Sequence, residues 1–159
     1  MAKKEEKTNV MRLLDAAGLE YKTWCYADTD AVSGVEVADV LGQDRDRVFK
    51  TLVTVGRTKA NYVFVIPVAE ELDLRKAAAA VGEKNIEMIR SKELLPLTGY
   101  IHGGCSPIGM KKPFVTVLDE TAQLFDTIIF SAGKIGYQVQ LSPESLQQLV
   151  PFTYADLTQ

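Results

Sequence analysis

The sequence predicts an α+β fold, in which surrounding helices cover a curved, mostly antiparallel mixed sheet with a barrel-like shape. Helical and strand-like periodicities follow one another without the strict alternation that builds a parallel sheet. Two β-rich runs, 48–55 and 62–68, flank the short turn-forming segment 56–61, as in an antiparallel hairpin. The 159 residues, 47% of them hydrophobic, fit one compact domain over 1–159, with a charged end at 1–7 that we expect to be flexible.

Each predicted helix carries a local start or stop signal. A helix over 10–17 has Thr8 or Asn9 as its cap. Ser33 and Glu36 have the spacing of a capping box, which opens a second helix. The remaining predicted helices are 72–81 with Asp73 as cap, 92–95 with Ser91 as cap, and 142–150 with Pro143 at the first helical position.

Further strands are predicted outside the hairpin, because β-rich runs recur between turn residues. The glycine-containing turn 133–136 separates the last two of them. These strands are 19–26, 99–102, 114–118, 127–130 and 137–141.

Composition limits the class of protein. No apolar run is long enough to span a bilayer, so no membrane association is predicted. The net charge of −3 argues against a broad basic surface for duplex nucleic acid, although a small basic pocket stays open. Cys25 and Cys105 form no metal-binding pair, and the single histidine, His102, cannot complete a familiar zinc set. We therefore predict a cytoplasmic protein with reduced thiols and no metal or other cofactor.

The segment 103–109, Gly-Gly-Cys-Ser-Pro-Ile-Gly, is the most unusual stretch of the chain. Three glycines and a proline predict a loop. Either its N–H groups approach a ligand closely, or it is a tight structural turn, and composition leaves both interpretations open. If the loop binds a ligand, a methyl group at Gly103 or Gly104 should enter the ligand's space and lower activity more than stability.

One polar residue interrupts an apolar strand, and another ends one. Lys50 lies in the run 48–55. It either faces inward, where it offers donors and a charge to an ester or phosphate oxygen, or faces outward as a gatekeeper on an edge strand. Ser131 ends an apolar strand before a glycine turn, so that it either caps the turn or contacts a ligand.

The residues alone provide no credible enzyme nucleophile. The sequence has no G-x-S-x-G elbow, Walker loop, dinucleotide fingerprint or pair of acids. A Ser–His–Asp triad would need His102, which stands beside a glycine pair. The nearness of His102 to Cys105 in sequence does not establish a thiol–imidazole pair.

Several motifs occur together and in one order along the chain. They are Val48-Phe49-Lys50-Thr51-Leu52, Val65-Ile66-Pro67-Val68, Leu72-Asp73-Leu74, Thr98-Gly99-Tyr100, the run from Gly103 to Lys112, and Ser131-Ala132-Gly133-Lys134. Jointly they resemble the YbaK-type family of Cys-tRNA(Pro) deacylases, which is related to the editing domain of bacterial prolyl-tRNA synthetases. The resemblance extends over about 8–157.

The resemblance implies a barrel-like α+β fold without a metal, and an enzyme that hydrolyses the ester of a mischarged tRNA. It implies that Lys50 is catalytic, and it gives Cys105 no nucleophilic role. Ser33 stands where some relatives have an aromatic residue and Gln138 where some have an acid, and both departures bear on amino-acid specificity. The substrate-binding residues that it implies are Tyr26, Thr51, Gly103, Gly104, Cys105, Ser106, Pro107 and Ser131.

The resemblance also implies where the nucleophile comes from. The cysteinyl substrate attacks its own ester carbonyl with its thiol, giving a cyclic thiolactone and free tRNA, and intramolecular attack has a large effective molarity. The enzyme then folds the substrate and stabilises the oxyanion, which suits the glycine loop and Lys50.

The expected partners are the 3′ aminoacyl end of mischarged tRNA, foremost Cys-tRNA(Pro), and prolyl-tRNA synthetase. Two alternatives stay open. One is a non-catalytic module that binds the aminoacylated 3′ end or a synthetase, and the other is an unrelated small-molecule hydrolase that uses Cys105.

Overall fold

The structure is a computed structural model that describes residues 7–159, so the end predicted to be flexible, 1–7, lies outside the described residues except for Lys7. Within the described range, the helices are α1 (Asn9–Ala16), α2 (Gly34–Leu41), α3 (Leu74–Val81), α4 (Ser91–Thr98) and α5 (Pro143–Leu149), with short 3₁₀ helices η1 (Arg45–Arg47) and η2 (Glu120–Leu124). The strands are β1 (Lys22–Cys25), β2 (Phe49–Gly56), β3 (Asn61–Pro67), β4 (Ile86–Met88), β5 (Val115–Asp119), β6 (Ile128–Ser131), β7 (Tyr137–Leu141) and β8 (Phe152–Ala155).

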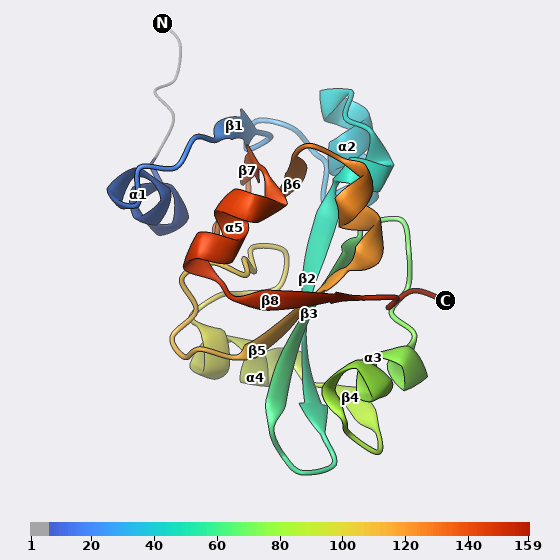
Figure 1. Ribbon diagram of the computed structural model, residues 1–159. Coiled ribbons are helices and arrows are strands. Elements are labelled where there is room, and N and C mark those ends of the chain that lie inside the picture. Colours follow the sequence, from blue (N-terminus) through green and yellow to red (C-terminus); the bar gives the residue numbers. More distant parts are fainter. Residues whose placement is uncertain (1–6) are drawn as a thin grey trace, which may run out of the picture.

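The strands form two sheets, with the long β2–β3 hairpin at the centre of the molecule (Figure 1). Five strands lie in the order β4-β2-β3-β5-β8, and three lie in the order β1-β7-β6. Four strand pairs are antiparallel, whereas β3–β5 and β5–β8 are parallel. An isolated parallel bridge between Val48 and Ile129 connects the two sheets. The α+β class and the mostly antiparallel mixture are confirmed, and the barrel-like shape stays a prediction because residues 7–159 form two sheets and no closed one.

The β2–β3 hairpin separates two apolar clusters. Alternate residues of β2, Phe49 and Val53, pack in the larger cluster with β6, β7 and α1. In β3, Phe64 and Ile66 point to the other face and pack against α3 in the second cluster. The partly buried Leu52 belongs to this second side. The two faces of β2 therefore look into different parts of the molecule.

Local capping signals set most helix ends as predicted. The side chain of Thr8 accepts a hydrogen bond from the α1 backbone. Ser33 and Glu36 make both bonds of the capping box that opens α2, and Gly42 ends this helix in the left-handed conformation. Asp73 caps α3 through two bonds from the first helical turn.

Two predictions between 91 and 102 are wrong. Ser91 does not cap a short helix, because α4 itself begins at Ser91 and continues to Thr98 without a side-chain cap. The strand predicted over 99–102 is a turn instead. Gly99 ends α4 with φ of 85°, and the Thr98 hydroxyl accepts a hydrogen bond of 3.0 Å from the Tyr100 N–H. These local bonds occupy backbone groups that a strand would need for its ladder.

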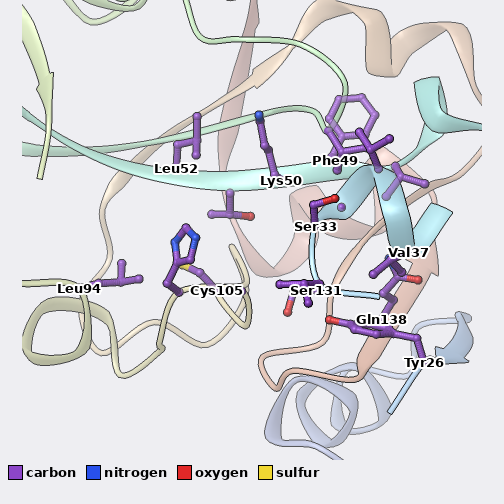
Figure 2. Close-up of a pocket in the computed structure, with 18 residues that line it drawn as sticks. Tyr26, Ser33, Val37, Phe49, Lys50, Leu52, Leu94, Cys105, Ser131 and Gln138 are labelled. Carbon is purple, nitrogen blue, oxygen red and sulfur yellow. The ribbon is translucent and has the colours of Figure 1, made fainter. Parts of the chain in front are cut away.

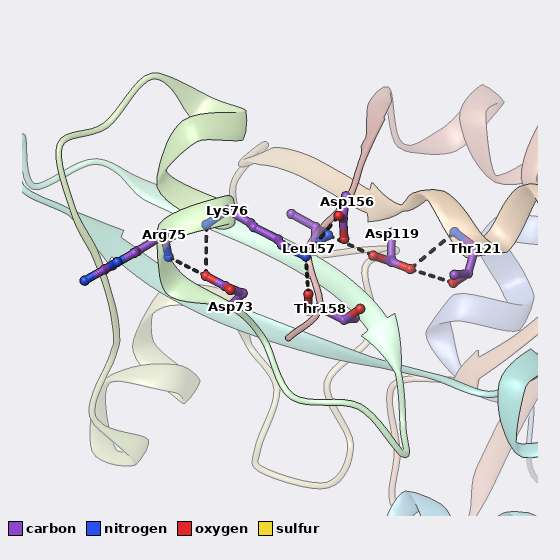
Figure 3. Close-up of polar contacts among 8 residues, drawn as sticks. All are labelled: Asp73, Arg75, Lys76, Asp119, Thr121, Asp156, Leu157 and Thr158. Carbon is purple, nitrogen blue, oxygen red and sulfur yellow. Dashed lines mark hydrogen bonds and ion pairs between the residues drawn. The ribbon is translucent and has the colours of Figure 1, made fainter.

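A buried carboxylate fixes the segment that follows β8 (Figure 3). Asp119, at the end of β5, is 1% exposed. Its Oδ1 accepts a bond of 2.9 Å from the Leu157 N–H, and its Oδ2 accepts one of 2.6 Å from the Thr121 hydroxyl. The Nζ of Lys76 in α3 donates to Oδ2 of Asp156 at 2.9 Å. We refer to Lys76, Asp119, Thr121, Asp156 and Leu157 as the C-terminal anchor.

Within residues 7–159, the helices are all too short or too polar to cross a membrane. In the same part of the chain, His, Cys, Asp and Glu side chains do not gather in groups of three or more that could hold a metal ion.

Candidate functional site

A cavity of about 370 Å³ lies between α2, β2, the glycine loop 103–109 and the ends of β6 and β7 (Figure 2). Its lining combines apolar and polar side chains from segments far apart in sequence. The lining residues are Tyr26, Val32, Ser33, Gly34, Val35, Val37, Val48, Phe49, Lys50, Thr51, Leu52, Val68, Leu94, His102, Gly103, Cys105, Ser131 and Gln138. Of the predicted site residues, the cavity brings together Tyr26, Lys50, Thr51, Gly103, Cys105 and Ser131, and its lining does not include Gly104, Ser106 and Pro107.

Lys50 and Thr51 reach the cavity from opposite faces of β2. Figure 2 shows the side chains of Lys50 and Leu52 leaving this strand on the same side, with Ser131 across the ribbon. Lys50 is half-buried, and its amine has no hydrogen bond or ion pair with any residue of 7–159. It is therefore neither a core lysine nor a gatekeeper facing only solvent. Its three donors have no partner among residues 7–159, and Figure 2 shows the amine on the side of β2 opposite to Ser131 and Cys105.

The hydroxyl of Thr51 is the least satisfied polar group of the site. Its Oγ1 is buried and has no hydrogen-bond partner among residues 7–159. Buried side-chain oxygens are paired in the large majority of cases, and an unpaired one costs about 1–3 kcal/mol. A hydroxyl in this position can donate to or accept from a molecule in the cavity.

Ser131 and Gln138 form the polar wall opposite β2. They are direct partners in the antiparallel β6–β7 pair, so their side chains lie side by side. The Ser131 hydroxyl accepts a bond of 3.1 Å from the Gly133 N–H, as expected of a residue that caps the turn. Ser131 also lines the cavity, so its two predicted roles are compatible in geometry. Its hydroxyl hydrogen is left for a further bond.

The glycine loop is held by its own hydrogen bonds. The Gly104 N–H donates to the Ile101 carbonyl at 3.0 Å, and the Ser106 hydroxyl accepts from the Ile108 N–H at 3.3 Å. The phenol of Tyr100 donates to the carbonyl of Ile108. These bonds explain why the middle of the loop faces the protein, while Gly103 and Cys105 face the cavity.

The reason expected for an effect at Gly104 needs correction, while the expectation for Gly103 stays a prediction. A Cβ at Gly104 would lie 3.1 Å from the backbone nitrogen of Ile135, and one at Gly103 would lie 3.6 Å from an Ile135 side-chain carbon. Gly103 also has φ of 89°, which disfavours any other residue. The methyl group at Gly104 would press against the backbone of the β6–β7 turn, and the one at Gly103 would make an ordinary van der Waals contact there. Gly104→Ala would therefore disturb the contact between the loop and the β6–β7 turn, whereas Gly103→Ala would strain the loop backbone through its positive φ.

Cys105 has the environment of a buried, inert thiol. It is 9% exposed, and burial raises the pKa of its thiol to about 12. At neutral pH the sulfur therefore carries its proton, and the thiolate is the reactive form. His102 is exposed, and no hydrogen bond links it to Cys105. The geometry gives no support to a thiol–imidazole pair.

The sequence patterns did not place the start of α2 or α4 at the site, although the family resemblance had marked Ser33 as bearing on specificity. The N-terminal turn of α2 contributes Ser33, Gly34 and Val35, and α4 contributes Leu94. The first N–H groups of a helix have no partner within the helix, so this end of α2 adds donors to the wall. The capping box marked this helix end in the sequence, but nothing local indicated that it borders a cavity.

The cavity lining contains basic side chains and, among residues 7–159, no acidic ones. Its lining includes Lys50 and His102, and it includes no Asp or Glu from residues 7–159. With Ser131, Gln138 and the α2 end, this makes a cavity rich in donors. Such a surface binds oxygen acceptors and stabilises negative charge as it develops.

Known proteins are similar to this chain in sequence and in fold. EbsC of Enterococcus faecalis (strain ATCC 700802 / V583), whose name assigns it provisionally as a Cys-tRNA(Pro)/Cys-tRNA(Cys) deacylase, is 48% identical over 161 residues, covering 99% of this chain and 98% of EbsC. A proline–tRNA ligase of Shouchella clausii (strain KSM-K16) is 29% identical over 70% of this chain, which is 19% of the ligase. A crystal structure assigned, also provisionally, to a trans-editing enzyme for prolyl tRNA synthetase has a TM-score of 0.79 and 26% identity, covering 94% of this chain and 96% of the other.

The match to a family model includes the whole wall of the cavity from α2 to β7. The model of the aminoacyl-tRNA editing domain matches residues 28–149. This range contains every cavity residue except Tyr26. The chain therefore belongs to the aminoacyl-tRNA editing domain family.

Proposed function

We propose that this protein is a deacylase that acts in trans on mischarged tRNA, with Cys-tRNA(Pro) as its foremost substrate. The observation that carries the proposal is a donor-rich cavity whose lining thiol, Cys105, is buried and protonated, in a chain of the editing family. EbsC, at 48% identity over nearly its full length, supports cysteinyl-tRNA as the substrate class.

In this proposal the thiol of the substrate attacks the carbonyl carbon of its own ester. The C–S bond forms, the bond from the carbonyl carbon to the ribose oxygen breaks, and the thiol proton passes to the ribose oxygen. The products are a cyclic thiolactone, which water then opens, and free tRNA. The protein's share is to bend the substrate and to stabilise the oxyanion.

We assign these tasks to the groups whose hydrogen-bonding capacity is unused. Lys50 is the proposed catalytic residue, because its free ammonium group can stabilise the oxyanion. Thr51 and Ser131 are proposed to bind the ester end through their hydroxyls. The other proposed substrate contacts are Tyr26, Gly103 and Cys105. Gly104 and Ser106 are proposed to act by supporting the loop through their hydrogen bonds, and Pro107 is proposed to act as part of the same loop.

We further propose that the chain acts as one editing domain in the cytoplasm, where charged tRNA is used. Prolyl-tRNA synthetase is the proposed protein partner. The related stretch within a proline–tRNA ligase supports this, because the ligase carries in one chain what this protein would supply separately.

The proposal is tested by measuring amino-acid release from a panel of charged tRNAs. Cys-tRNA(Pro) should be deacylated fastest, with Ala-tRNA(Pro) and Pro-tRNA(Pro) slow, and Cys-tRNA(Cys) shows whether the tRNA body matters. A protein that only binds the 3′ end would leave every ester intact. Fast release from the alanyl ester would mean that water, and not the substrate thiol, is the nucleophile.

A further inference from the structure

Two glutamine side chains meet at the cavity wall, although 95 residues separate them in the chain. The Nε2 of Gln43 donates a hydrogen bond of 2.9 Å to the Oε1 of Gln138. Gln43 follows the left-handed Gly42 that ends α2, and its N–H bonds back to the Ala38 carbonyl at 2.8 Å. Gln138 is 6% exposed and lines the cavity beside Ser131. The side-chain amide of Gln138, in the cavity wall, is thus held by Gln43, which follows α2.

The orientation of this pair decides what Gln138 presents to the cavity. The Oε1 of Gln43 is buried and has no hydrogen-bond partner within 7–159. If both amides were reversed, the buried unpaired atom would be an NH₂ group with two unused donors. Orphaned buried N–H groups are rarer than under-satisfied carbonyl oxygens, because each unused donor adds its own desolvation cost. The orientation in which Gln43 donates is therefore favoured, although amide ends are assigned from such networks.

This orientation leaves the Nε2 of Gln138 as the free end. The described residues offer it no hydrogen bond, and its neighbour Ser131 also has a hydroxyl hydrogen to donate. We propose that Gln43 is a positioning residue, which fixes the NH₂ group of Gln138 toward the cavity to bind an acceptor oxygen of the aminoacyl ester. The inference rests on the proposed function and assigns a contact within the same site.

Substitutions of Gln43 test the inference through kcat/KM for Cys-tRNA(Pro). Gln43→Glu can only accept, so Gln138 turns its oxygen toward the cavity, and kcat/KM should fall roughly tenfold, mainly through kcat if the contact strengthens in the transition state. Gln43→Met has neither donor nor acceptor, and the loss should be about threefold because Gln138 is released. Gln43→Lys keeps a donor and should stay within about twofold of wild type.

Gln140 provides a matched control on the same strand. It is 9% exposed, and both ends of its amide are paired, to the Trp24 indole and the Thr127 hydroxyl, outside the cavity. Gln140→Ala should lower the melting temperature and leave kcat/KM unchanged. Equal losses in Gln43→Lys and Gln43→Glu, or wild-type rates in both Gln43→Glu and Gln43→Met, would overturn the inference. If Gln43→Glu does not fold, the Met and Lys variants still decide.

A second measurement separates this inference from the proposed function. Exchange of the Gln138 side-chain amide protons with water, followed by NMR, needs no substrate. The protons should exchange quickly in the wild type and become protected in Gln43→Glu, where they bond to the carboxylate. Protected protons in the wild type overturn the inference even if Cys-tRNA(Pro) is deacylated. Absence of deacylation overturns the proposed function, while the exchange result still reports the amide orientation.

Discussion

The cavity wall and the C-terminal anchor differ in how completely their polar groups are paired. In the anchor, both oxygens of Asp119 accept hydrogen bonds, and Lys76 is paired with Asp156. At the cavity, Lys50 has no partner within residues 7–159, and Thr51 Oγ1 is buried without one. The energetic consequence differs, because paired groups stabilise the fold, whereas unpaired groups cost stability and remain available to a ligand.

The largest expected effect is on the cavity side. Lys50→Ala should lower kcat/KM about 100-fold, which corresponds to about 3 kcal/mol, because one donor to the oxyanion is lost. The melting temperature should hardly change, since the amine makes no bond within the described residues. Deacylation kinetics of this variant check the loss of kcat/KM, and its thermal unfolding checks the unchanged melting temperature.

The matched control for Lys50 is Lys76, a lysine whose partner is known. The Asp156 carboxylate raises the pKa of Lys76 and holds its ammonium group. Lys76→Ala should lower the melting temperature slightly and leave kcat/KM at the wild-type value. A Lys50→Ala variant that retains its rate, or that loses stability like Lys76→Ala, would contradict the idea that the cavity lysine serves activity and the anchor lysine serves stability.

The next effect is on the anchor side. Asp119→Ala should lower the free energy of unfolding by about 2–3 kcal/mol, because the Leu157 N–H and the Thr121 groups lose a buried acceptor. Urea unfolding measures this loss. At 25 °C, where the variant stays folded, its kcat/KM should equal that of the wild type. A large loss of kcat without a loss of stability would mean that the anchor belongs to the site.

A smaller effect, on both stability and rate, is expected in the glycine loop 103–109. Gly104→Ala should cost about 1 kcal/mol of stability and also lower the rate, because its methyl group would displace the Ile135 backbone in the turn between Ser131 and Gln138. Gly18 is the control, because a Cβ there meets nothing within 4 Å while φ is 69°. Gly18→Ala should cost stability alone. A Gly104→Ala variant with full stability and a reduced rate would restore the idea that the methyl group fills substrate space.

The same contrast separates what the sequence could predict from what it could not. Helix caps such as Thr8, Ser33 and Asp73 were predicted correctly, because each depends on bonds within a few residues. The short edge strands β4 and β8 were not predicted, since each is only three or four residues long and was not part of a longer β-rich run recognised in the sequence. Their existence depends on pairing with distant strands.

The site shows the same limit. Lys50 could be picked out because it interrupts an apolar strand and Ser131 because it ends one before a glycine turn, and their grouping with Tyr26 came from the family resemblance. The contact between Gln43 and Gln138 had no local signal, because it is created by the end of α2 and by β7 only after folding. Sequence patterns therefore found individual polar residues and missed the bond that orients one of them.

The smallest expected effect concerns Cys105. This residue lines the cavity, but we expect it to contribute to the fold, as the anchor residues do, and not to the reaction. Cys105→Ala should keep kcat/KM within about twofold of wild type on Cys-tRNA(Pro), because the pKa of the thiol, raised by burial to about 12, leaves no thiolate at neutral pH. An enzyme that used this sulfur would lose nearly all activity in the same variant. That outcome would favour the hydrolase that depends on Cys105 and would remove the substrate thiol from the mechanism.

The same substitution has a second consequence, which is visible only in alkali. Because the folded pKa of Cys105 lies above its ordinary value of 9.0, folding favours the protonated thiol, and this contribution to stability is fully present below pH 9. It is lost as the pH rises from 9 toward 12, since the unfolded chain then releases the proton more readily than the folded one. Tyr21, whose pKa burial also raises to about 12, behaves alike in both proteins and cancels in the comparison. Burial and the charge of Cys105 both raise the pKa of Tyr100, so the loss of Cys105 changes the Tyr100 contribution in the same direction and adds to the difference. Wild type should therefore lose stability faster than Cys105→Ala above pH 9 in urea unfolding, while parallel curves would show that the thiol is more accessible to water than its 9% exposure indicates.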